Sequence, residues 1–98
     1  MTFYSRAQVA KLLELDEGFV MSLEREEIIQ ADAPAESEGE FSERMLERAR
    51  VARELVRELD VNLAGAAIIV RMREQMLEMR ESFEKQLLEI RERFQQSD

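Results

Sequence analysis

The sequence predicts an all-α fold with at most a minimal β wing, built as a helix-turn-helix unit, a third helix and a long C-terminal helix. Only three Gly and one Pro are present among 98 residues, so little of the chain suits turns. Charged residues make up 37% and aromatic residues 6%, a balance typical of long solvated helices. Apolar residues also recur at helical spacing. We expect a helix-turn-helix and wing domain over residues 1–59, with an acidic loop at 30–40, and a coiled-coil-like helix over residues 60–98.

The first two helices are predicted over residues 5–15 and 17–26. Ser5 and Gln8 have the spacing of a capping box, which places the first helix start at Ser5. Asp16 is suited to cap the second helix. A unit of about 30 residues buries little core by itself, so it must pack on another element. The apolar stripes of the two helices comprise Val9, Leu12, Leu13, Phe19, Val20 and Leu23.

An acidic stretch separates this unit from the third helix. Residues 30–40 contain three Glu, one Asp, one Pro and one Gly, and they indicate either a mobile acidic loop or a degenerate wing hairpin near Ile28 and Phe41. Ser42 is a good N-cap for a third helix over residues 43–59. We expect Phe41 and Leu46 to form a hydrophobic staple across its start.

The fourth helix is predicted over residues 63–93, with Asn62 as its cap and Gly65 allowing close packing on the third helix. Apolar residues recur every seven positions, which is typical of coiled-coil pairing. The third helix is too short to cover the whole seam, so residues 83–94 are expected to pack against a second chain. The predicted homodimer interface comprises Ile69, Met76, Phe83, Leu87 and Ile90, with Met72, Met79 and Phe94 beside them.

The residue types present argue against an enzyme. The chain has no Cys and no His, so thiol chemistry and the commonest general base and metal ligand are missing. Adjacent Glu26 and Glu27 point apart on a helix, and the loop acids lack EF-hand spacing. We expect no catalytic, cofactor-binding or metal-binding residue. The longest apolar run has eight residues, far below the about 20 of a membrane span, so we expect a cytoplasmic protein without a membrane segment.

The charge distribution indicates what kind of partner the chain binds. The net charge is −8, and residues 1–41 hold three basic and ten acidic side chains while residues 42–98 are nearly balanced. A DNA-reading helix needs Arg, Lys, Asn or Gln near its start. The second helix instead begins with Asp16 and Glu17, which would repel phosphates. DNA binding is therefore disfavoured, and an interaction protein is favoured.

Three short motifs carry a family resemblance. Residues 4–10 (YSRAQVA) resemble the opening of a MerR-type winged helix-turn-helix, and residues 39–46 (GEFSERML) resemble its wing end and third helix. Residues 61–66 (VNLAGA) are similar to the helix start of MerR-like heat-shock repressors and chaperone modulators. A short chain that ends in one long helix most resembles the CbpM-like chaperone modulators.

This resemblance implies a function in chaperone control. CbpM-like proteins bind the J-domain of a DnaJ/CbpA-type co-chaperone and limit its action with Hsp70. MerR-type regulators carry an Arg after the wing glycine, where this chain has Glu40. Two alternatives stay open. One is a MerR-family DNA-binding regulator, alone or with a basic partner subunit, and the other is a dimerisation adaptor with an unrelated client. The candidate surface for a basic J-domain helix comprises Glu14, Glu17, Glu24, Glu26 and Glu27.

Overall fold

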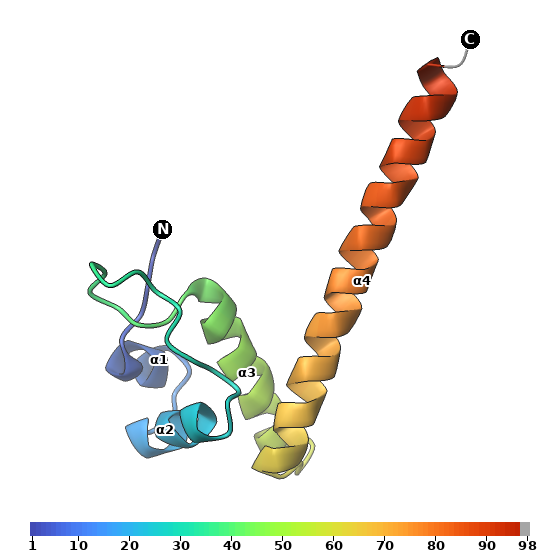
Figure 1. The fold of residues 1–98 in the computed structure, drawn as a ribbon. Coiled ribbons are helices and arrows are strands. Elements are labelled where there is room, and N and C mark those ends of the chain that lie inside the picture. The colour runs from blue at the N-terminus through green and yellow to red at the C-terminus, as the bar shows by residue number, and fades with distance from the viewer. Residues whose placement is uncertain (97–98) are drawn as a thin grey trace.

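The computed structural model describes residues 1–96 and confirms the all-α prediction over that range. Four helices follow one another along the chain: α1 (Arg6–Leu12), α2 (Glu17–Arg25), α3 (Glu43–Glu58) and α4 (Leu63–Gln96). The first three gather at one end of α4, and the C-terminal half of α4 extends away from them (Figure 1). The molecule is accordingly elongated, with principal extents of 61, 36 and 19 Å.

Local side-chain chemistry sets where the helices begin. The Ser5 cap is reciprocal: its hydroxyl accepts the backbone N–H of Gln8 at 3.2 Å, and the Gln8 side chain accepts that of Ser5 at 2.8 Å. Asp16, Ser42 and Asn62 each accept a backbone N–H three residues further along. These bonds satisfy donors that the first turn of a helix leaves unpaired. The predicted starts of all four described helices are therefore confirmed.

The ends of the helices differ more from prediction. The first helix was expected to reach residue 15, but it ends at Leu12 because Glu14 adopts a left-handed backbone with φ 55°. Glu27 and Asp60 adopt similar angles, 59° and 55°, just after α2 and α3. Gly is the usual residue in this conformation, so these helix ends could not be predicted from residue type. In the other direction, α4 continues to Gln96, past the predicted residue 93.

Two arginines of α3 bind the backbone at the end of α1. Arg53 donates to the Leu13 carbonyl at 2.8 Å, and Arg57 donates to the Glu14 carbonyl at 2.7 Å. Cationic side chains can satisfy the carbonyls that the last turn of a helix leaves unpaired. These bonds join α3 to the turn between α1 and α2, so this turn depends on residues about forty positions away.

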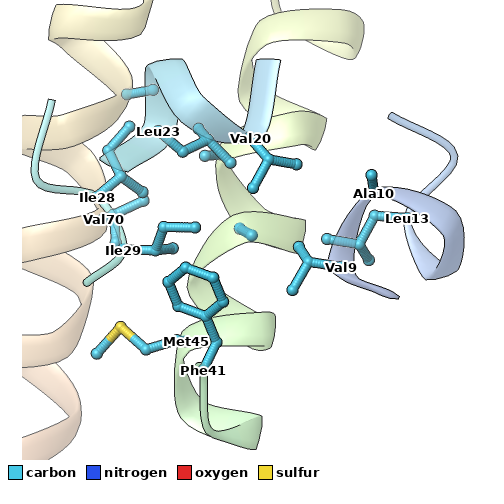
Figure 2. Packing of buried hydrophobic residues seen from close by; sticks show 13 residues of the cluster. Val9, Ala10, Leu13, Val20, Leu23, Ile28, Ile29, Phe41, Met45 and Val70 are labelled. Carbon is cyan, nitrogen blue, oxygen red and sulfur yellow. The ribbon is translucent and has the colours of Figure 1, made fainter. Parts of the chain in front are cut away.

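The hydrophobic core lies between the four helices. Side chains from α1 and α2 meet Phe41 and Met45, and Val70 enters from α4 (Figure 2). Ala49 and Ala52 on α3 are fully buried, and small side chains there let neighbouring elements approach closely. The buried set comprises Val9, Ala10, Leu13, Val20, Leu23, Ile28, Ile29, Phe41, Met45, Ala49, Ala52, Ala66 and Val70.

The wing is reduced to a single antiparallel bridge. Tyr4 donates to the Phe41 carbonyl at 2.7 Å and accepts the Phe41 N–H at 2.9 Å, so Phe41 bridges to Tyr4 and not to Ile28. Gly39 lies against this segment: a Cβ at Gly39 would be 2.4 Å from the Phe3 carbonyl carbon and from the Tyr4 nitrogen. Gly39 is thus required for the acidic loop to pack on the N-terminal segment.

The contact between α3 and α4 differs from the predicted one. Ala66 and Val70 are the buried residues of α4, while Ile69 and Met76 on the predicted seam stay exposed beside α3. Helix α3 therefore packs beside the predicted seam and buries neither of these two residues. A Cβ at Gly65 would meet Val61 and Asn62 of its own helix start, so this glycine leaves room for the Asn62 cap and does not serve packing on α3.

Candidate partner-binding surfaces

One candidate surface lies where α1 meets α2, around Arg6. The Arg6 guanidinium forms two bonds to the Glu24 carboxylate, from Nε at 2.8 Å and from Nη2 at 3.2 Å. The bond and charge of Glu24 raise the pKa of Arg6, and the charges of Glu40 and Glu17 add to the effect. Three acidic side chains from α2 and the loop thus act on a single cation.

A shallow groove of about 570 Å³ opens beside this ion pair. It is lined by Arg6 and Glu24, by Gly18 and Met21 of α2, and by Arg25. The Met21 side chain is 50% exposed although it is apolar. Arg25 donates to the Ser22 hydroxyl at 2.8 Å, so both arginines of the groove have a partner on the protein. We call this feature the Met21 groove.

The predicted glutamates do not form one cluster. Glu17 and Glu24 act together on Arg6, but Glu14 lies beside the last turns of α3, in a hollow lined by two arginines and two other glutamates. Glu26 and Glu27 follow the end of α2 and do not line the Met21 groove. The carbonyl of Glu27 accepts a long bond of 3.5 Å from Arg48.

Sequence reasoning did not assign several residues of this surface: Arg6, Gly18, Met21, Arg25 and Glu40. Met21 could have been found, because it is an apolar residue that lies off the stripe formed by the buried Val20 and Leu23. Arg6 and Glu40 had no comparable signal, since their approach to α2 depends on tertiary packing.

The arginines of α3 are engaged within the protein. Arg44 and Arg48 both bind Glu74 of α4, at 2.9 and 2.8 Å. Arg50 binds Glu47 at 2.5 Å and also Glu54. The bond from Arg50 lowers the pKa of Glu47. Together with the carbonyl bonds of Arg53 and Arg57, these contacts leave α3 without a row of unpaired cations for phosphates.

The second candidate surface is the apolar stripe of α4. Its five predicted interface residues are all exposed, from 39% for Ile69 to 68% for Met76. The intervals between successive stripe residues are three or four, with one consecutive pair of fours around Phe83. Such an insertion locally unwinds a coiled coil. An open apolar groove of about 490 Å³ runs along the proximal part, lined by Ile69, Met72, Arg73, Met76, Leu77 and Arg80.

A family model described as MerR HTH family regulatory protein matches residues 4–92. The chain belongs to this family. No curated protein and no solved structure matches the chain. The matched range includes the Met21 groove and the five predicted interface residues of α4. The similarity of this MerR-family chain to the family therefore extends beyond the short motifs to nearly the whole sequence.

Family membership identifies α2 of this MerR-family chain as the second helix of the helix-turn-helix. In a DNA-binding helix-turn-helix, the second helix enters the major groove with its N-terminal residues against the base edges. Here that position carries Asp16 as the cap and Glu17 in the first turn. Among residues 1–96, no group of three or more acidic side chains is arranged to hold a metal ion, and no helix is long and apolar enough to cross a membrane.

Proposed function

We propose that this MerR-family protein is a chaperone modulator that binds the J-domain of a DnaJ/CbpA-type co-chaperone and limits its action with Hsp70. The observation that carries the proposal is the acidic surface beside α2, where Glu24 binds Arg6 and the charges of Glu17 and Glu40 also act on it. The resemblance to CbpM-like proteins supplies the partner, because their J-domain targets present a basic helix to Hsp70. Complementary charge favours fast and specific association.

The engaged arginines of α3 support this choice over DNA. Binding to duplex DNA depends on cations that neutralise phosphates and release counterions. In this protein the cations nearest to α2 are already bonded, Arg6 to Glu24 and Arg25 to Ser22. Acidic side chains outnumber them on the same face.

The proposal includes a homodimer formed through α4. Ile69, Met76, Phe83, Leu87 and Ile90 would pair with the same stripe of a second copy. A long run of exposed apolar side chains on one helix face is typical of an interaction site. A second copy brings a matching stripe of the same length, and pairing would remove both from water.

Calorimetric titration against an isolated J-domain tests the proposed function. We expect binding that weakens as salt is added, because exposed charges are screened. Glu17→Lys should weaken binding chiefly through the on-rate. Glu89→Lys, the same charge change on an exposed position of α4, is the matched control and should bind like the wild type. Equal weakening by both variants would assign the effect to net charge, and no binding by the wild type would refute the function.

A DNA-binding regulator is the second candidate, and membership of the MerR HTH family is compatible with it. Titration with a DNA duplex separates the two functions. Glu17→Lys should leave or raise affinity for DNA, because it removes a repulsive charge from the helix start. Tight, sequence-specific DNA binding by the wild type at physiological salt would replace the chaperone proposal.

A further inference from the structure

The Met21 groove combines an apolar floor with a charged rim. Met21 lies in it half exposed, and Gly18 contributes no side chain, which leaves the first turn of α2 open. The bidentate bond between Arg6 and Glu24 fixes one wall, and the bond from Arg25 to Ser22 holds the other. A flexible thioether on such a floor adapts to apolar side chains of different shapes.

We infer that the Met21 groove takes one apolar side chain from a basic helix of the partner, with the helix itself lying across Glu17, Glu24 and Glu40. This inference rests on the proposed function and names how the same surface recognises its target. The apolar contact supplies affinity, and Glu24 in the groove wall, with Glu17 and Glu40 near Arg6, favours a helix of basic charge.

The charges around the groove decide the class of occupant. A second copy of this chain would form a symmetric contact in which the same acidic side chains face each other. Like charges at such a short range oppose association. Nucleic acid and acidic peptides meet the same repulsion from Glu17, Glu24 and Glu40. A basic amphipathic helix is the occupant that satisfies both the floor and the rim.

Gly18 has a second role that limits which substitutions are informative. A Cβ at Gly18 would lie 3.1 Å from the Asp16 carboxylate oxygen, which caps α2. Filling the groove from Gly18 would therefore disturb the helix start together with the groove. Substitution of Met21 avoids this difficulty, because its side chain is half exposed and caps nothing.

Methyl NMR on the full chain tests the inference directly. The six methionines are Met1, Met21, Met45, Met72, Met76 and Met79, so ¹³C-methyl labelling gives one probe in the groove, one in the core and three on α4. A J-domain is added stepwise, and a Met21→Leu variant assigns the groove signal. We expect the Met21 methyl to shift while the methyls of the buried Met45 and of the α4 stripe stay in place.

Binding by variants completes the test. Met21→Asp should weaken J-domain binding about tenfold or more, as expected for a residue at the centre of an interface. Leu12→Asp is the matched control, since Leu12 is 56% exposed on α1 and does not line the groove; it should bind like the wild type. Circular dichroism confirms that both variants are folded.

The possible outcomes distinguish failure of the Met21 groove as a binding site from failure of J-domain binding itself. If the wild type binds the J-domain but the Met21 methyl does not move and Met21→Asp binds normally, this inference is refuted and the proposed function stands. If the α4 methyls shift instead, the partner docks on the stripe and the groove is not the site. If no binding occurs at all, the proposed function fails, and the inference fails with it.

Discussion

Phe83 lies midway along the apolar stripe of α4, and its truncation tests the proposed dimer. Its side chain is 61% exposed in the single chain, which is about 120 Å² of an aromatic residue. An alanine at this position would still expose about 40 Å², so Phe83→Ala removes about 80 Å² of buried apolar surface per copy. That area corresponds to about 2 kcal/mol per copy and about 4 kcal/mol per dimer, a rise of about a thousandfold in the dissociation constant.

Sedimentation equilibrium over a concentration series measures this constant. Leu88→Ala is the matched control, because Leu88 has a similar exposure of 57% on the same helix but lies off the stripe. We expect Phe83→Ala to shift toward monomer at concentrations where the wild type and Leu88→Ala remain dimeric. Equal dissociation of both variants would show that pairing does not use this face. A monomeric wild type at micromolar concentration would refute the dimer. Contact with α3 could not explain that result, because the buried residues of α4 are Ala66 and Val70 and the stripe is uncovered.

Three further substitutions test the fold around the candidate surface. Gly39→Ala forces a Cβ against the backbone of residues 3–4 and should lower the free energy of unfolding by about 1–3 kcal/mol, measured by urea denaturation. Asp16→Ala removes the α2 cap and should cost about 1 kcal/mol in the same assay; no loss would mean that Phe19 N–H finds water instead. The bond from Arg50 lowers the pKa of Glu47 from 4.5, so the stabilisation is present above pH 4.5 and is lost as pH falls below it. Glu47→Gln should flatten this part of the acid unfolding profile, and an unchanged profile would assign acid unfolding to other carboxylates.

The starts of the helices were predictable because their chemistry is local. Ser5, Asp16 and Ser42 each accept a backbone N–H three residues ahead, and that spacing can be seen in the sequence. The end of α1 was not predictable, because the groups that bind its last carbonyls are Arg53 and Arg57, about forty residues further along. No local pattern marks Glu14 as a residue with a left-handed backbone.

The candidate surfaces were likewise predictable in part. Heptad spacing alone identified the stripe of α4, but it did not show that α3 packs on the small residues Ala66 and Val70 and leaves the stripe free. The excess of acidic side chains in residues 1–41 follows directly from the composition of that segment. Which acids act together depends on the position of Arg6 against α2, and only the folded chain supplies that.

The same helix-turn-helix scaffold can serve DNA or protein, and the use of its cations decides between them. A chain that reads DNA must keep Arg and Lys exposed beside α2, where phosphates dock. Here the arginines of α3 bind Glu74, Glu47 and the carbonyls that end α1, and Arg6 binds Glu24. The bonds to Glu74, to Glu24 and to the carbonyls that end α1 join one element to another, and the bond to Glu47 lies within α3. Each of them also engages a cation that could otherwise meet a phosphate. The acids that remain unpaired therefore set the field outside α2, and they favour a basic protein surface over a phosphate backbone.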